Sequence, residues 1–177
     1  KESLEMISRN AEQAAQSIKS LLDFAKTGRA RPVEASLQGV VRSAAKAVEK
    51  SSISRGVKLE LKLPDLPPIL IDPQQVRAVV LSLLVNAVEA VAEGGRVEVS
   101  IEAEAGGGAL LRVQDDGPGM SAEVLSRAGG PFFTTKETGT GLGLYLAKRV
   151  LAEHGATITF ESAPSKGTLA LIRFPPK

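Results

Sequence analysis

Three short segments of this chain carry residue types that together could bind a nucleotide. Asn86 lies in an apolar stretch, residues 115–119 read Asp-Asp-Gly-Pro-Gly, and residues 139–144 read Gly-Thr-Gly-Leu-Gly-Leu. An amide oxygen can bind a hard cation such as Mg²⁺, a carboxylate can accept from the exocyclic amine of a base, and free N–H groups at the start of a helix can bind phosphates. Together the segments predict a split nucleotide pocket.

Asn86 and Asp115 each also have an ordinary explanation. Asn86 could face solvent or cap the backbone, and an Asp-Gly pair is common in turns. However, an unsatisfied amide on the buried face of an apolar helix costs about 1–3 kcal/mol, so Asn86 needs a partner. Asp115 ends an expected strand whose apolar residues direct it inward. We therefore treat Asn86 as a candidate metal ligand and Asp115 as a candidate ligand of the base.

The glycine-rich segment fits neither of the two best-known phosphate-binding motifs. It lacks the G-x-x-x-x-G-K-[ST] pattern, and its alternating glycines at 139, 141 and 143 differ from G-x-G-x-x-G. The alternation instead frees backbone N–H groups just before a predicted helix, whose dipole favours phosphate. Lys136 is a candidate contact for the terminal phosphates, and the alternative is an exposed lysine in a lid.

The single histidine, His154, is predicted to have a structural role. It lies in the last turn of a predicted helix, just before Gly155, where the helix dipole favours an imidazolium. Since the chain also has no cysteine, we expect no Ser-His-Asp or Cys-His nucleophile and no histidine-based metal site.

Composition argues against several other classes of function. The 22 Lys and Arg residues nearly balance the 20 Asp and Glu residues, and aromatic residues make up 3% of the chain, so no nucleic-acid partner is expected. The lack of cysteine excludes disulfides and fits a reducing compartment, which favours a cytoplasmic location. The apolar runs are too short to cross a bilayer, so no transmembrane segment is expected.

The first part of the chain has the pattern of a helix that needs partner helices. Apolar residues from Leu4 to Ala25 recur at alternating spacings of three and four, which makes a heptad seam that ends at Gly28. A bundle or dimer is favoured, and the alternative is a helix on the surface of its own domain. Because Lys1 begins inside this pattern, we expect a longer parent protein. The predicted divisions are a helix over residues 1–27, a hinge over 28–32 and a main domain over 33–177.

The main domain alternates between helical and strand patterns. Ser36 and Asp72 are N-cap signals for two helices. Residues 119–139 are rich in glycine and indicate a mobile lid rather than a packed element. The result is a helix layer over a mixed sheet. Helices are predicted over 37 to about 50, 73 to about 92 and 142 to about 154, and strands over 33–35, 57–63, 69–71, 97–101, 111–115, 157–161 and 168–174.

The motifs, taken in order, closely resemble the catalytic ATP-binding domain of bacterial two-component sensor histidine kinases. The pieces are an Asn on a long helix, DDGPGM at 115–120, PFFTTK at 131–136 and GTGLGL at 139–144. The resemblance covers residues 33–174, and the heptad helix resembles the second helix of the dimerisation and histidine-phosphotransfer hairpin. It implies a two-layer α/β (α+β) sandwich, with helices over a mixed, mostly antiparallel sheet, preceded by one long N-terminal helix.

The same resemblance implies roles for individual residues. Asn86 would bind Mg²⁺, Asp115 would bind the adenine amine, and Gly117 and Gly119 would shape the base pocket. Residues 132–136 would form the lid. The full set of predicted nucleotide-binding residues is Asn86, Glu89, Asp115, Gly117, Gly119, Phe133, Thr134, Thr135, Lys136, Gly139, Thr140, Gly141, Leu142 and Gly143, with ATP and Mg²⁺ as the ligands.

Two departures from the family pattern affect the expected reaction. The family commonly has an Asn one turn before the metal-binding Asn, and its hydrolysing members have a general-base Glu there, whereas this chain has Ser82. Ser82 cannot act as that base, so phosphoryl transfer is preferred over hydrolysis. The family's phosphoacceptor histidine motif is also absent around His154. We expect that histidine on a helix that precedes Lys1.

The function implied is therefore transfer of the ATP γ-phosphoryl group to a histidine on a helix missing from this chain, for signalling to a response regulator receiver domain. A homodimer is implied for the full-length protein, as is a cytoplasmic location, either free or as the cytoplasmic part of a membrane-anchored sensor. Two alternatives use the same fold: a nucleotide-responsive binding module without transfer, and an anti-sigma-factor-like serine kinase. The heptad helix counts against the serine kinase, which carries no phosphotransfer hairpin.

Overall fold

The computed structural model describes residues 30–176 apart from residue 105 and residues 137–138. The predicted heptad helix, and with it the division at residue 27, lies outside the described residues. Within the described ranges, no helix combines the length and the apolar content needed to cross a membrane. In chain order the elements are β1 (Val33–Ala35), α2 (Leu37–Ser54), β2 (Lys58–Lys62), β3 (Ile69–Ile71), α3 (Pro73–Ala90), β4 (Arg96–Ala103), β5 (Ala109–Asp115), α4 (Ala122–Arg127), α5 (Gly143–Glu153), β6 (Thr157–Ser162) and β7 (Thr168–Phe174).

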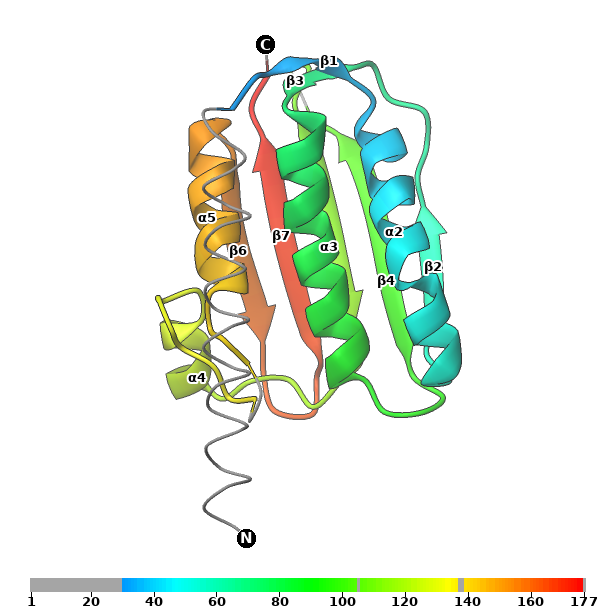
Figure 1. Ribbon diagram of the computed structural model, residues 1–177, viewed down its shortest axis with the longest axis vertical. Coiled ribbons are helices and arrows are strands. Elements are labelled where there is room, and N and C mark those ends of the chain that lie inside the picture. The colour runs from blue at the N-terminus through cyan, green and yellow to red at the C-terminus, as the bar shows by residue number, and fades with distance from the viewer. Residues whose placement is uncertain (1–29, 105, 137–138, 177) are drawn as a thin grey trace, which may run out of the picture.

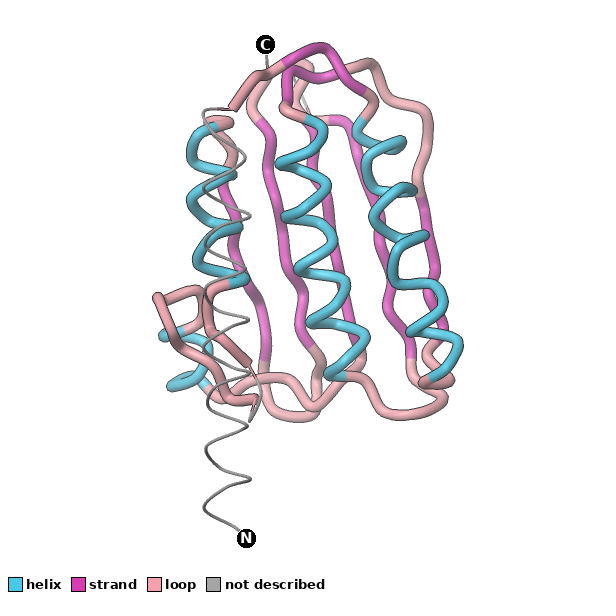
Figure 2. Tube along the Cα trace, in the orientation of Figure 1, coloured by secondary structure: helices cyan, strands magenta, loops and turns pink. Residues whose placement is uncertain are grey.

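The described residues form two layers, with helices over one face of a five-stranded sheet (Figure 1). The strand order is β2-β4-β5-β7-β6, in which β2 and β4 are parallel and the other neighbours are antiparallel. A separate antiparallel pair, β1 and β3, lies at one end of the layers (Figure 2). The predicted fold class, helices over a mixed and mostly antiparallel sheet, is confirmed.

The two predicted N-caps both begin helices. The Ser36 side chain accepts from the Gly39 N–H at 3.0 Å, and Asp72 caps α3 with Pro73 at its first position. Helix α2 continues to Ser54, four residues beyond the predicted end, because Val48 and Ser52 still face the core. These caps set where the helices start, and burial sets how far they run.

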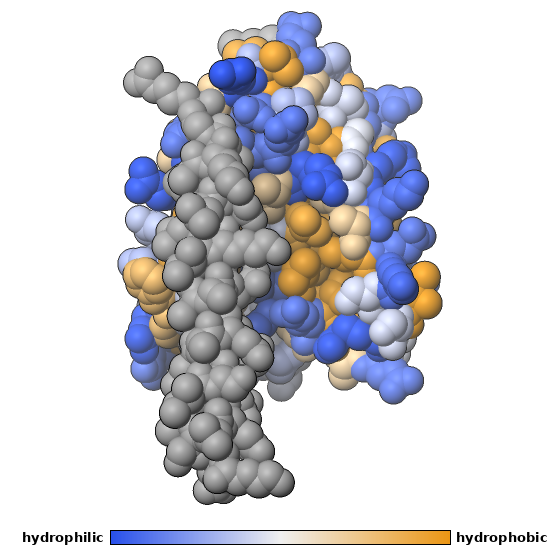
Figure 3. Space-filling model, in the orientation of Figure 1, coloured by the Kyte–Doolittle hydropathy of each residue, from blue (hydrophilic) through white to orange (hydrophobic). Residues whose placement is uncertain are grey.

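Helix α3 is apolar on nearly all sides because it is the central helix, packed between α2 and α5 and against the sheet (Figure 1). Val76, Val80 and Leu84 of α3 are fully buried, as are inward-facing residues of β4, β5 and β7. Apolar side chains also reach the surface on the helix side of the molecule (Figure 3). Val85 of α3 is 38% exposed. The rigid core thus surrounds the helix that carries Asn86.

The prediction that residues 119–139 contain no packed element was wrong in part, because α4 forms within it. The Ser121 side chain caps α4 by accepting from the Val124 N–H at 3.3 Å, and Glu123 lies in the first turn. This Ser followed by an acidic residue is a helix-start signal that the sequence analysis missed. No residue of α4 is buried, so apolar periodicity gave no sign of it.

The predicted imidazolium at His154 was also wrong, because its ring is held in the neutral form. Nε2 lies 2.9 Å from the backbone nitrogen of Asp72, and Nδ1 lies 2.8 Å from the carbonyl oxygen of Val150. Since a backbone N–H only donates, Nε2 must be the unprotonated acceptor and Nδ1 the donor. The buried ring joins the end of α5 to the start of α3, a structural role as expected.

Candidate nucleotide-binding site

A cavity of about 960 Å³ opens between α3, α5, the sheet and the segment before α5. Its volume is at the upper end of the roughly 300–1,000 Å³ typical of small-molecule pockets. Of the predicted nucleotide-binding residues, Gly117 and Leu142 do not line it. Those that do are Asn86, Glu89, Asp115, Gly119, Phe133, Thr134, Thr135, Lys136, Gly139, Thr140, Gly141 and Gly143.

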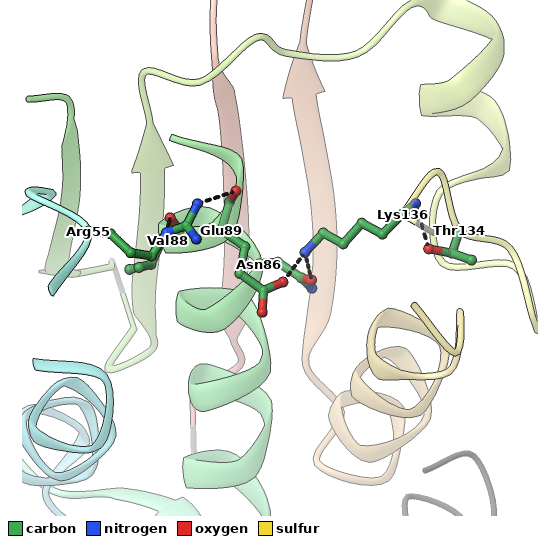
Figure 4. Close-up of polar contacts among 6 residues, drawn as sticks. All are labelled: Arg55, Asn86, Val88, Glu89, Thr134 and Lys136. Atoms are coloured by element: carbon green, nitrogen blue, oxygen red, sulfur yellow. Dashed lines mark hydrogen bonds and ion pairs between the residues drawn. The ribbon is translucent and has the colours of Figure 1, made fainter. Parts of the chain in front are cut away.

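Polar residues on one face of α3 form one wall of the cavity. Ser82, Asn86 and Glu89 are spaced by four and three, so they share a helical face, and all three line the cavity. Arg55, at the C-cap of α2, donates to the carbonyl oxygens of Val88 and Glu89 at 3.2 Å each (Figure 4). Arg55 therefore holds the C-terminal end of α3, where the helix dipole favours a positive charge.

Asp115 ends β5 at the base of the cavity and is only 7% exposed. Its Oδ1 accepts from the backbone N–H groups of Gly117 at 2.9 Å and Thr168 at 3.2 Å. Burial raises the pKa of Asp115 and the adjacent Asp116 acts in the same direction, while these two hydrogen bonds act against them. Within the described part of the chain Oδ2 has no hydrogen bond, so it can accept from a ligand.

The acidic turn packs directly on the turn between β6 and β7. A Cβ added at Gly119 would clash with the Ala163 carbonyl oxygen, and one added at Gly167 would clash with that of Asp115. Gly119 has a positive φ of 68°, which glycine adopts without strain. Glycine is therefore required at position 119 because two backbones touch there, and not only because a ligand must approach closely, as the sequence suggested. Gly117 supports Asp115 from behind the cavity wall.

The glycines before α5 let three segments meet. A Cβ at Gly139 would clash with the Thr134 side chain, one at Gly141 with the Phe132 backbone, and one at Gly143 would lie 2.8 Å from Ser82 Oγ. Phe132 itself is 67% exposed and does not line the cavity, although it falls in the predicted lid. Close packing of lid and helices around the cavity thus requires these glycines.

The N-terminus of α5 borders the cavity at Gly143. Leu142 occupies the N-cap position with its side chain buried, and among the described residues no side chain caps this end. The first backbone N–H groups of α5 and the positive end of its dipole are therefore left for an anionic ligand. Thr140 helps to shape the turn, since its Oγ1 accepts from the Leu142 N–H at 3.3 Å.

Lys136 reaches across the cavity to α3 (Figure 4). Its Nζ donates to Asn86 Oδ1 at 2.9 Å and forms an ion pair with Glu89 Oε2 at 2.6 Å. Its backbone N–H donates to Thr134 Oγ1 at 3.1 Å. The side chain predicted to contact phosphates thus lies against the one predicted to bind the metal, in a contact that links positions 50 residues apart.

Two further contacts anchor the segment around α4. The Arg127 guanidinium stacks on the Phe133 ring with 4.3 Å to the ring centre, and Lys148 Nζ donates to the Ala128 carbonyl oxygen at 2.8 Å. Lys148 lies on α5, so the lid is tied to that helix. Neither contact was predicted from the sequence.

The structure also places at the site residues that no motif indicated. Thr168 lies opposite Asp115 in the antiparallel pair of β5 and β7. It is 53 residues away in the chain, and its backbone N–H supplies one of the two hydrogen bonds to Asp115. Only the register of the sheet brings them together. The other lining residues outside the motifs include Val113, Phe160 and Ala170.

The chain matches known protein families over most of its length. Residues 71–177 match the family described as histidine kinase-, DNA gyrase B-, and HSP90-like ATPase. Sporulation kinase E of Bacillus subtilis (strain 168) is 41% identical over 120 residues, which are 67% of this chain and 16% of that protein. Sensor histidine kinase ZraS of Klebsiella oxytoca is 32% identical over 171 residues, or 96% of this chain and 37% of that protein.

Solved structures show the same fold. The nucleotide-free catalytic domain of histidine kinase ThkA superimposes with a TM-score of 0.74 at 26% identity, covering 82% of this chain and 95% of that one. Full-length ShkA in complex with AMPPNP has a TM-score of 0.82 at 23% identity, covering 98% of this chain and 38% of that one. The chain therefore belongs to the family of histidine kinase-, DNA gyrase B- and HSP90-like ATPases and is homologous to the catalytic domains of sensor histidine kinases.

Proposed function

We propose that this chain is the catalytic ATP-binding part of a sensor histidine kinase and transfers the γ-phosphoryl group of ATP to a histidine on a helix outside the chain. One observation carries the proposal. One cavity large enough for ATP is lined by the amide of Asn86, which could bind a metal, by the buried carboxylate of Asp115 and by the uncapped N-terminus of α5 at Gly143. The chain spans 16% and 37% of the lengths of the two relatives named above.

ATP would bind with its base at Asp115 and its phosphates at α5. The Asp115 Oδ2 would accept from the adenine amine, beside Gly119 and Met120 in the cavity wall. The phosphates would bind the N–H groups around Gly141 and Gly143, where the helix dipole favours negative charge. The γ-phosphate would then lie beside the lid residues Thr135 and Lys136, which also line the cavity.

The residues present fit a magnesium ion at Asn86. Its Oδ1 already accepts from a cationic group, the Lys136 ammonium, at 2.9 Å, and oxygen is the donor atom that Mg²⁺ prefers. When bound, Mg²⁺ would neutralise charge on the phosphates. The chain's own contribution is to hold the amide oxygen in the cavity, with the end of α3 fixed by Arg55.

The chemistry asked of the domain is positioning rather than acid–base work. In the transfer, the bond from the γ-phosphorus to the β-phosphate oxygen breaks, a bond to an imidazole nitrogen forms, and ADP leaves, while the proton of the imidazole passes to an acidic neighbour on the absent helix. Ser82 lies in the cavity one turn before Asn86 and cannot activate water as a carboxylate would. Transfer is thus favoured over hydrolysis.

The partner of the phosphorylated protein is proposed to be a response regulator receiver domain. A structure of histidine kinase ThkA in complex with the response regulator TrrA shares this fold, with a TM-score of 0.80 at 21% identity. We also propose a homodimer built on the phosphotransfer hairpin, and a cytoplasmic location because ATP is available there.

The test uses two measurements. Isothermal titration of ATP with Mg²⁺ into this chain should show binding that is weakened in Asn86→Ala and in Asp115→Ala. A longer version that includes the proposed phosphotransfer helix should then take label from γ-labelled ATP, and the label should be acid-labile and base-stable. Acid-stable label would favour a serine kinase, and binding without label would favour a nucleotide-responsive module. Either result would overturn the proposed transfer.

A further inference from the structure

The contact between Lys136 and α3 places one positive charge against two oxygens of different kinds. The Lys136 Nζ lies 2.9 Å from the amide oxygen Oδ1 of Asn86 and 2.6 Å from the carboxylate oxygen Oε2 of Glu89 (Figure 4). Asn86 and Glu89 are three residues apart on α3, so both oxygens face the cavity from the same helical surface. The position between these two oxygens thus suits a cation.

A divalent metal and the ammonium cannot share that point. An amide oxygen and a carboxylate oxygen are both donors that a hard cation accepts, whereas a protonated lysine has no lone pair to offer a metal. Their charges also repel each other at this range. If a metal binds Asn86, the Lys136 ammonium must therefore leave. The Glu89 carboxylate then loses its ion-pair partner, although it still lies close to the position that the metal takes.

Resting on the proposed function, we propose that Glu89 is a second metal-facing oxygen beside Asn86, and that the Lys136 ammonium takes the place of the metal in the nucleotide-free domain. Binding of ATP with Mg²⁺ exchanges one cation for the other. Glu89 keeps a positive partner in both states, and Lys136 is released to donate to a phosphate oxygen. The lid therefore changes its attachment from α3 to the nucleotide.

The energetics favour such an exchange. The side chains of Lys136 and Glu89 are 38% and 48% exposed, and exposed ion pairs contribute only about 0–1 kcal/mol. The Lys136 backbone is held separately by Thr134, so its side chain can swing without moving the chain. The backbone of Glu89 stays in place because Arg55 binds its carbonyl oxygen. Two oxygens carried by one anchored helix and one loosely held cation are what a replaceable placeholder requires.

The first experiment measures how strongly the metal and ATP favour each other's binding. The ATP dissociation constant is measured by isothermal titration, once with excess Mg²⁺ and once with a chelator. The value with chelator divided by the value with Mg²⁺ gives the coupling ratio between metal and ATP. Glu89→Gln should lower this ratio about fivefold or more, while metal-free ATP binds no more weakly because a negative charge near the phosphates is gone. Glu49→Gln, which removes an exposed carboxylate on α2, is the matched control and should leave the ratio unchanged.

The second experiment needs no nucleotide. Binding of Mn²⁺ to the chain, followed by electron paramagnetic resonance, should become several-fold tighter in Lys136→Met, because the competing cation is gone. Adding Glu89→Gln to Lys136→Met should remove the gain. An unchanged coupling ratio in Glu89→Gln, or a gain in Mn²⁺ binding that survives in the double variant, would overturn the proposal. Failure of the proposed function would instead appear as wild-type chain that binds no ATP under either condition.

Discussion

Two aspartates lie at opposite ends of α3 and have opposite electrostatic settings. Asp72 caps the start of the helix and accepts three backbone N–H groups, from Gln74 at 3.0 Å, Gln75 at 3.2 Å and Arg31 at 3.0 Å. Asp115 lies beside the other end, where Gly117 packs on the Ala90 carbonyl, and it accepts only two, both on one oxygen. Both oxygens of the Asp72 carboxylate thus have hydrogen-bond partners, whereas Oδ2 of Asp115 has none among the described residues.

The pKa directions follow from this difference. Burial raises the pKa of Asp72, but the hydrogen bonds that it accepts from the backbone N–H groups of Arg31, Gln75 and Gln74 together outweigh burial and lower the pKa overall. At Asp115 burial prevails and the pKa is raised. Folding therefore stabilises the charge of Asp72 and penalises that of Asp115. A carboxylate whose burial is not offset within the chain is typical of a binding site, because a ligand can supply the missing hydrogen bond.

The basic partners at the two ends differ in the same way. At the Asp72 end, the buried neutral ring of His154 bonds two backbone groups from two helices. At the cavity end, the exposed Lys136 ammonium bonds two side-chain oxygens of one helix. The first contact is part of the core and is costly to break, and the second can be exchanged for a ligand. One end of the sandwich is specialised for stability and the other for binding.

The largest expected effect tests the binding end. Asp115→Asn should weaken ATP binding by about 2–3 kcal/mol, roughly 30- to 150-fold in the dissociation constant, because an amide N–H₂ would face the adenine amine. The Asn oxygen can still accept from Gly117 and Thr168, so the free energy of unfolding of the nucleotide-free chain should not fall. Titration calorimetry and urea unfolding measure the two quantities, with the exposed Asp65→Asn as control. A less stable variant would mean that Asp115 is structural.

The next effect tests the stable end. His154→Ala should lower the free energy of unfolding by about 2 kcal/mol, because it leaves a cavity and an unpaired Asp72 N–H in a site where the ring is only 9% exposed. ATP affinity should be unchanged at temperatures where the variant is folded. His154→Gln, whose amide oxygen can accept the same N–H, should recover part of the loss. A large loss of ATP affinity would contradict the separation of the two ends.

The smallest effect is the pH dependence, and it has opposite signs at the two ends. The lowered pKa of Asp72 means that its stabilisation is complete above the ordinary value of 3.8 and is lost as pH falls through the lower folded value. The raised pKa of Asp115 means that its penalty is complete above the folded value and is relieved as pH falls from there towards 3.8.

Urea unfolding of two variants should separate these terms. On acidification, the advantage of Asp115→Asn over wild type should shrink first, at pH values above 3.8. The deficit of Asp72→Asn should persist there and shrink only at lower pH. The reverse order would show that the two carboxylates are not set in opposite ways.

Most of the fold and much of the site could be predicted from local patterns. The caps at Ser36 and Asp72, the β4–β5 hairpin and the helix after the glycine-rich segment all depend on residues close together in the chain. Helix α4 was missed although its Ser121 cap is a local signal, because its exposed residues lack apolar periodicity. Errors at helix ends, as at Ser54, arose where burial rather than a cap decided the length.

Short stretches of sequence suffice to show which chemical groups are available, since a carboxylate at a strand end, an amide on an apolar helix and glycines before a helix are each encoded by a few adjacent residues. Their partners, in contrast, depend on how the chain packs in three dimensions. The pairing of Thr168 with Asp115, the capping of α3 by Arg55, the neutral ring of His154 and the contact of Lys136 with Asn86 join residues between 33 and 82 positions apart. Such contacts follow from sheet register and helix packing, which depend on the burial of the whole core rather than on any short segment.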